Sequence, residues 1–264
     1  MFLSSDCRFV VVWLPAEPGA QRRIGRVPLR NGSAPSWRVQ ITRGAVGTFT
    51  YRYDLTNAST AKDPIGSISL VIPAGARECE VENPTAVGRR WGGGTSATPI
   101  ARQWAFPGQP PGVYTGWFHH DQVLRPGQNL DGFGIRSPYR PGLTTAWFGS
   151  GEPLEFDQSW PDVVFKESEF VDERRWNGVE LITAGPVYPP GAPRETIVAG
   201  FRTQLADLVR NGFCDGQSEF VQSLSQALSN TSSFIPEVMN RQRPQTEIEK
   251  LLMAAIKANL AADQ

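Results

Sequence analysis

The stretch Val46-Gly-Thr-Phe-Thr-Tyr-Arg-Tyr-Asp-Leu-Thr56 alternates apolar and polar side chains. A period of two residues is typical of a β-strand that has one face in a core and the other in water. Because successive side chains of a strand point to opposite faces, the pattern predicts that its apolar residues share the core-facing side. These residues are Phe49, Tyr51, Tyr53 and Leu55.

A second alternating stretch follows after a polar turn from Asn57 to Pro64. Ile68, Leu70 and Ile72 alternate with smaller residues until Pro73, which cannot donate a backbone hydrogen bond and so ends the strand. The short connection predicts that the two strands pair in a hairpin-like manner.

Short apolar stretches recur along the chain, separated by turns among the 26 glycines and 22 prolines. Many short strands at close spacing favour an antiparallel arrangement over alternating strands and helices. We therefore expect a mainly β protein: an immunoglobulin-like or jelly-roll antiparallel β-sandwich with a C-terminal α-helical segment. The further predicted strands are Phe9–Leu14, Ile100–Phe106, Val113–His119, Leu130–Ser137, Leu143–Phe148, Val163–Lys166 and Val179–Thr183.

Helical periodicity begins after the proline-rich stretch Pro189–Pro193. One apolar stripe starts at Ile197 and ends at a plausible cap, Asn211–Gly212, and a second starts near Gln217. A capping-box pattern from Thr246 to Glu249 opens a third helix. We expect the first two helices to pack as a hairpin, and the stripe from Ile248 to Leu260 to dock on them or to mediate self-association. The hairpin contact should consist of Phe201, Leu205, Leu208, Phe220, Leu224 and Leu228.

These patterns divide the chain into three parts. We expect an N-terminal strand and irregular arm over residues 1–36, a β-sandwich domain over 37–188 and a helical segment over 194–264. Residues 15–36 show no periodicity and are expected to be a loop or extended arm.

Composition argues against charge-driven partners. The 26 basic and 26 acidic residues balance, so we expect no nucleic-acid binding. Only four of the basic residues are lysines, which leaves 22 arginines and suggests a bacterial source. No apolar stretch approaches the roughly 20 residues of a membrane-spanning helix. No secretory signal is expected in the first 14 residues, whose apolar run is short and follows Asp6 and Arg8.

Three cysteines, Cys7, Cys79 and Cys214, are widely spaced and odd in number. They define neither a metal motif nor a disulfide framework. At most one bridge can form, with Cys7–Cys79 as one option, and Cys214 is expected to stay unpaired.

The stretch Val123-Leu-Arg-Pro-Gly-Gln-Asn-Leu-Asp-Gly-Phe-Gly-Ile-Arg-Ser-Pro-Tyr-Arg-Pro-Gly-Leu-Thr-Thr-Ala-Trp-Phe-Gly149, with its two Pro-Gly turns between strands, resembles bacterial exported immunoglobulin-like β-sandwich modules. The stretch from Phe201 to Leu228, two leucine-rich helices around a glycine turn, is similar to the short helical hairpin appended to many secreted bacterial proteins. These resemblances imply an extracellular or cell-surface location. Neither pattern carries a catalytic set.

The chain lacks the common metalloprotease, hydrolase, phosphate-loop, Cys-x-x-Cys and calcium-loop motifs. His119 with Asp121 can share one face of a strand and supply half of a metal or acid–base site, or simply form a solvated strand end. The loop at Arg89-Arg90-Trp91 offers an aromatic plate with charged edges, or a tryptophan folded onto the sandwich. The candidate ligand-binding residues are Arg90, Trp91, His119 and Asp121.

Acidic residues around Trp160 give an alternative site. Paired carboxylates suit glycosidic bond hydrolysis when they lie about 5–10 Å apart, and the same residues can ligate calcium. They are Glu152, Glu155, Asp157 and Asp162.

Our preferred hypothesis is a non-catalytic exported or cell-surface module for binding or adhesion, with a glycan or protein as its ligand and with no cofactor. The first alternative is a glycan-acting hydrolase with its site near Trp160. The second is a structural assembly protein that associates through its C-terminal helices.

Overall fold

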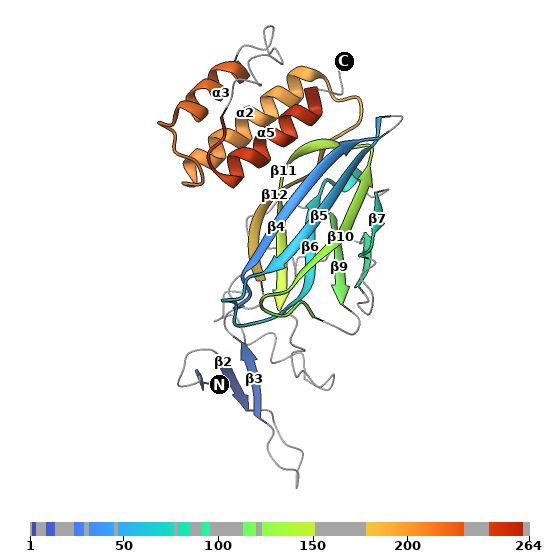
Figure 1. The fold of residues 1–264 in the computed structure, drawn as a ribbon, viewed down its shortest axis with the longest axis vertical. Helices are drawn as coiled ribbons and strands as arrows, with labels where there is room; N and C mark the ends of the chain where they lie inside the picture. The colour runs from blue at the N-terminus through green and yellow to red at the C-terminus, as the bar shows by residue number, and fades with distance from the viewer. Residues whose placement is uncertain are drawn as a thin grey trace.

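The computed structural model describes residues 2–3, 9–13, 24–28, 32–44, 47–76, 79–84, 91–95, 113–119, 123–150, 178–229 and 243–260. Within these ranges the protein is mainly β, with two sheets of an antiparallel sandwich and helices after the last strand (Figure 1). The fold class expected from the sequence is confirmed.

One sheet of the sandwich has four strands, in the order β4-β5-β10-β7. All of its pairings are antiparallel. We call it the front sheet, because it faces the viewer in Figure 1. Its strands are β4 (Pro35–Arg43), β5 (Phe49–Asn57), β7 (Glu80–Glu82) and β10 (Asn129–Ser137).

The back sheet has five strands, in the order β12-β11-β6-β9-β8, and is also antiparallel. Consecutive strands pair in β4–β5, β8–β9 and β11–β12, whereas the connections between β5, β6, β7 and β8 pass from one sheet to the other. The strands of the back sheet are β6 (Ile65–Ile72), β8 (Trp91–Thr95), β9 (Val113–His119), β11 (Arg140–Ser150) and β12 (Gly178–Tyr188).

The alternating stretch from Phe49 to Thr56 lies in β5, and its four apolar side chains are all buried with at most 1% exposure, as predicted. The predicted pairing of this strand with the one from Ile68 to Ile72 is wrong. β5 pairs with β4 and β10, whereas β6 pairs with β11 and β9 in the other sheet. The connection therefore crosses the sandwich, which places the apolar faces of both strands against one core.

Aromatic side chains fill the centre of the sandwich. Trp37 stacks on Tyr53 with ring centroids 4.7 Å apart, and the edge of Trp117 meets Phe133 at 5.4 Å. The Trp117 indole N–H donates to the Glu82 carbonyl at 3.0 Å, which satisfies a polar group that packing has removed from water.

Residues 2–28 contribute a separate three-stranded antiparallel sheet, β1-β2-β3. β2 (Phe9–Trp13) confirms the predicted first strand, and β1 (Phe2–Leu3) pairs with it. The arm expected over residues 15–36 needs correction, because it contains β3 (Ile24–Pro28) and the start of β4. β3 lacks an alternating pattern and is held by its backbone pairing with β2.

Three helices follow β12: α2 (Arg194–Arg210), α3 (Glu219–Ser229) and α5 (Glu247–Leu260). Their apolar stripes form a second core that includes all six residues of the predicted hairpin contact. The stripe of α5 docks in the same core, and α5 also lies on β11, β12 and β4. In Figure 1 the helices stack across one end of the sandwich.

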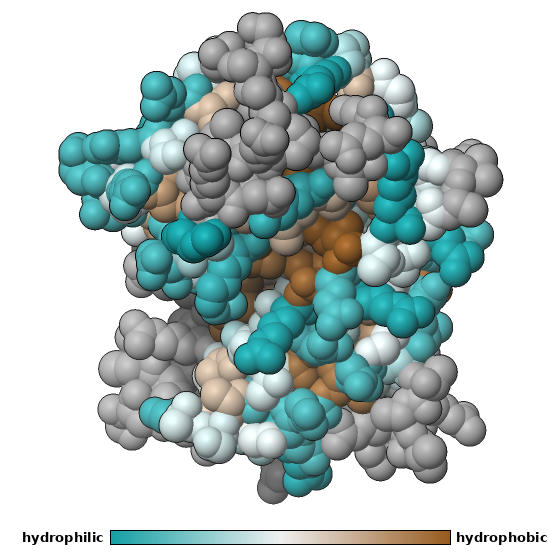
Figure 2. All heavy atoms as spheres, turned by 45° about the horizontal axis from the view of Figure 1, so that its top comes forward, coloured by the Kyte–Doolittle hydropathy of each residue, from teal (hydrophilic) through white to brown (hydrophobic). Residues whose placement is uncertain are grey.

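The helical core also includes two residues of β12, Ala184 and Tyr188, so the apolar stripes are buried against the sandwich as well as against one another. Val39 and Ile41 of β4 are half-buried and border both cores. Figure 2, in which the helical end of Figure 1 is turned forward by 45°, shows a band of apolar side chains among hydrophilic ones. The helices therefore cover apolar surface of the sandwich. That residues 37–188 nevertheless form an independent domain stays a proposal, which a truncation can test.

Candidate binding surface

The outward side of the front sheet carries polar and charged residues from all four strands. On β5, Arg52 and Asp54, which alternate with buried residues, are exposed, as is every second residue of β4. No described helix or strand lies over the middle of this side (Figure 1), and α5 borders it at β4. We call it the charge-split face and define it by Arg38, Gln40, Thr42, Thr50, Arg52, Asp54, Glu80, Glu82, Asp131, Gly134 and Arg136.

The strand register places these residues in rows that run across the sheet. One row, which we call the central row, reads Gln40, Arg52, Gly134 and Glu82 from β4 to β7. The next row contains Thr42, Thr50, Arg136 and Glu80. Directly opposite residues in an antiparallel sheet lie about 5 Å apart, so the residues of each row are direct neighbours across the sheet.

Charge is distributed unevenly across the charge-split face. On the β4–β5 half, Arg38, Arg52 and Asp54 give a net charge of +1. On the β10–β7 half, one arginine and three acidic residues give a net charge of −2. The face therefore has a positive and a negative half.

The arginine of the negative half is engaged within the sheet. Arg136 contacts Glu80 at 3.2 Å and Glu82 at 3.5 Å. These pairs are exposed, so they contribute little to stability, but they hold the guanidinium among acidic groups. Arg52, by contrast, has no ion pair among the residues that the structure describes. Its charge faces solvent.

Gly134 leaves the centre of the face without a side chain. A Cβ atom at this position would lie 3.0 Å from the Glu82 Cβ and 2.9 Å from its Oε2. The glycine thus lets the Glu82 side chain lie against β10.

The residues that the sequence suggested as a ligand site lie elsewhere. Trp91 begins β8 and is only 4% exposed, with its ring edge-on to Phe133 at 5.4 Å. His119 ends β9, and its backbone pairs with that of Trp91. Arg90 and Asp121 lie outside the described residues. Because Trp91 is in the core, it does not present the exposed aromatic plate that stacking on a ligand requires.

The glycines that follow Trp91 continue strand β8. Gly93 pairs opposite Trp117, and a Cβ at 93 would lie 2.5 Å from the Trp117 Cδ1. A glycine is required there because the indole ring occupies that space. This packing requirement is invisible in the local sequence.

The acidic group around Trp160 lies in the stretch 151–177, outside the described residues. Within the described ranges, no three His, Cys, Asp or Glu side chains are placed to hold a metal ion. Within the same ranges, no helix is both long and apolar enough to cross a membrane.

The charge-split face has only a partial signal in the sequence. The polar positions of the alternating stretch, Thr50, Arg52 and Asp54, indicate the exposed side of one strand. Which polar residues of β7 and β10 join them depends on the strand order, which no local pattern reveals.

Comparison with known proteins adds little. No protein-family model and no curated protein matches the chain. Among solved structures, it is similar to a cohesin module from a family 33 glycoside hydrolase of Clostridium perfringens, at 9% identity and a TM-score of 0.29, over 60% of this chain and 98% of that one. A likeness at this level assigns neither family nor function.

Proposed function

We propose that this chain is a non-catalytic binding module that recognises a protein partner through the charge-split face. The observation that carries the proposal is an exposed polar sheet face that lies on a layer of fully buried aromatic residues. No described element covers the middle of this face.

The shape of the surface favours a protein over a small molecule. Small ligands bind in concave sites that enclose most of their surface. A sheet face is broad and open, as most protein interfaces are. Arginine is enriched at such interfaces, and Arg38 and Arg52 are exposed on the positive half.

The support beneath the face is rigid. Tyr51 and Tyr53 are fully buried under Arg52, and the Tyr53 hydroxyl donates to the Ala184 carbonyl of the opposite sheet at 3.1 Å. A surface that does not reorganise loses less conformational entropy on binding. An exported or cell-surface location, as the sequence resemblance implies, is part of this proposal.

The alternatives have less support. The hydrolase hypothesis depends on residues outside the described ranges. Assembly through the C-terminal helices requires exposed apolar stripes, yet Leu252, Met253 and Ile256 of α5 are at most 3% exposed.

The test compares two charge reversals. Proteins captured by the immobilised full-length chain from an extract of the source organism are purified and titrated against wild type, Arg52→Glu and the control Arg202→Glu, an exposed arginine on α2. The proposal predicts at least about tenfold weaker binding for Arg52→Glu and unchanged binding for Arg202→Glu, because only the first reversal replaces an attraction at the interface by a repulsion. Equal affinities for all three proteins, or selective binding to a glycan array, would overturn it.

A further inference from the structure

We infer that the charge-split face is self-complementary and docks a second copy of this chain, face to face. The inference rests on the proposed function, in that it takes this face to be the binding surface, and it names the occupant. What carries it is the opposite charge of the two halves.

Symmetry determines how two copies can meet. Two identical faces pack through a two-fold axis that lies in the plane of the interface. If the axis runs across the strands, the positive half meets the positive half of the second copy. If it runs along the strands, between β5 and β10, each positive half meets a negative half. The charges therefore select the second arrangement.

The central row fits this arrangement. An axis between β5 and β10 places β5 of one copy over β10 of the other. Arg52 then meets Gly134 of the second copy, against which the Glu82 side chain of that copy lies. The symmetry repeats this contact, so the interface contains two Arg52–Glu82 pairs.

The size and polarity of the face indicate weak association. With three strand spacings of about 4.8 Å and a strand length of about 30 Å, the charge-split face has an area of roughly 400 Å² when treated as flat. A standard stable interface buries about 800 Å² on each partner. The outward side also lacks an apolar centre, so we expect a transient dimer that dissociates as salt screens its charges.

The experiment is trans-complementation of two charge reversals. Sedimentation equilibrium measures the dissociation constant of the full-length chain, of Arg52→Glu and of Glu82→Arg at low and high salt. In the homodimer of either variant, both contacts between positions 52 and 82 bring two like charges together. Each variant should therefore dimerise at least about tenfold more weakly than wild type. In an equimolar mixture, the carboxylate introduced by Arg52→Glu in one copy meets the guanidinium introduced by Glu82→Arg in the other. The second pair of that mixed dimer is native, so dimerisation should return to near the wild-type level.

Matched variants on the helices, Arg202→Glu and Glu195→Arg, carry the same charge changes and should leave self-association unchanged. Circular dichroism and urea denaturation verify that every variant is folded. If Glu82→Arg is unfolded because it repels Arg136, Glu80→Arg replaces it, and its mixture with Arg52→Glu should likewise self-associate more tightly than either variant alone.

A wild-type chain that stays monomeric at millimolar concentration in low salt would overturn the inference, as would a dimer that neither reversal weakens. The proposed function fails separately, when Arg52→Glu leaves binding of a purified partner unchanged. A monomeric chain whose partner binding depends on Arg52 would therefore overturn the inference and keep the proposed function.

Discussion

The side-chain amide of Gln204, on α2, bonds both backbone groups of Leu143, on β11. Its Oε1 accepts from the Leu143 N–H at 3.1 Å, and its Nε2 donates to the Leu143 carbonyl at 3.1 Å. The pairing of β11 with β6 extends from Ser150 to Ala146, so no strand among the described residues pairs with this edge of β11 at Leu143. The amide takes the place of a neighbouring strand and joins the helices to the sandwich.

Replacing Gln204 with leucine should destabilise the protein by about 2 kcal/mol, because two backbone groups at a packed interface lose their partners. Urea denaturation followed by fluorescence measures the change. The matched control is Gln222→Leu, on the exposed side of α3, which should have little effect. Equal stability of both variants would show that water replaces the Gln204 amide without loss.

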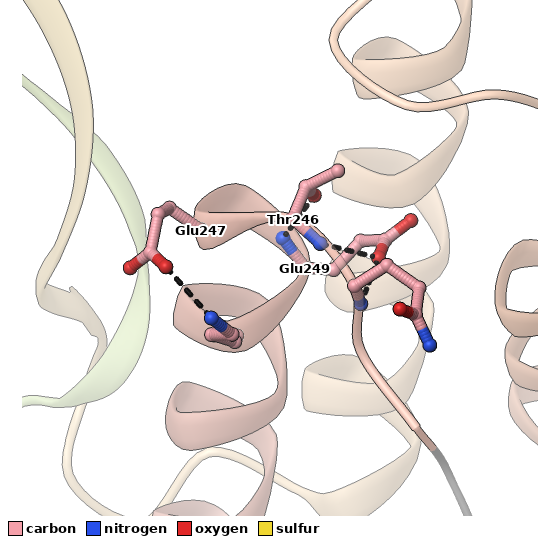
Figure 3. A network of polar contacts seen from close by, with 5 residues as sticks. Thr246, Glu247 and Glu249 are labelled. Carbon is pink, nitrogen blue, oxygen red and sulfur yellow. Dashed lines mark hydrogen bonds and ion pairs between the residues drawn. The ribbon is translucent and has the colours of Figure 1, made fainter.

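The first turn of α5 contains the predicted capping box, shown in Figure 3. The Glu249 N–H donates to the Thr246 Oγ1 at 3.2 Å, while Glu249 Oε2 accepts from the N–H groups of Thr246 at 3.0 Å and Gln245 at 2.7 Å. Replacing Glu249 with alanine should lower the free energy of unfolding by about 1–2 kcal/mol, because backbone donors at the helix start lose their acceptor.

The adjacent exposed pair offers a control for this prediction. Lys250 Nζ contacts Glu247 Oε1 at 2.7 Å, and this contact, more than the charge of Arg38, lowers the pKa of Glu247. Because Glu247 is fully exposed, we expect Lys250→Ala to leave the urea midpoint almost unchanged. A larger shift for Lys250→Ala than for Glu249→Ala would contradict this account of the helix start.

Truncation after Pro193 tests whether the sandwich is an independent domain. We expect the β signature in circular dichroism to persist, because the core of the sandwich is formed by residues that precede the helices. The truncated protein should unfold at lower urea and bind a hydrophobic dye, since Leu143 and Ile182 lose the helices that cover them. Loss of the whole β signature would show instead that sandwich and helices form one cooperative unit.

Cys214 is a free thiol, as predicted, and it is buried in the helical core. Burial, and to a smaller extent the Glu249 carboxylate, raise the pKa of the thiol. Since the thiolate is the reactive form, labelling of native protein should be slow at pH 8 and should accelerate only at a higher pH than for an ordinary cysteine. A variant with serine at positions 7 and 79 isolates this thiol. Labelling at the rate of the unfolded chain would show that the site is open.

Where the chain has a clear apolar period, the sequence alone predicts which residues are buried. Alternation identified the core side of β5, helical spacing identified the six residues of the hairpin contact, and the pattern from Thr246 to Glu249 located the start of α5. These features follow from the local geometry of strand and helix, which repeats every two or 3.6 residues wherever the chain lies.

Which elements are neighbours depends on the tertiary fold. The strand order places β5 and β6 in different sheets and puts Arg52 and Glu82 in one row of the front sheet. It also pairs Gly93 with Trp117, so that the glycines after Trp91 form a strand. Asn57 appears in the sequence as an ordinary turn residue, yet it is fully buried and bonds Ala34, Asp63 and Leu124. These relationships depend on contacts between distant segments, which form when apolar faces are buried together and which no local period encodes.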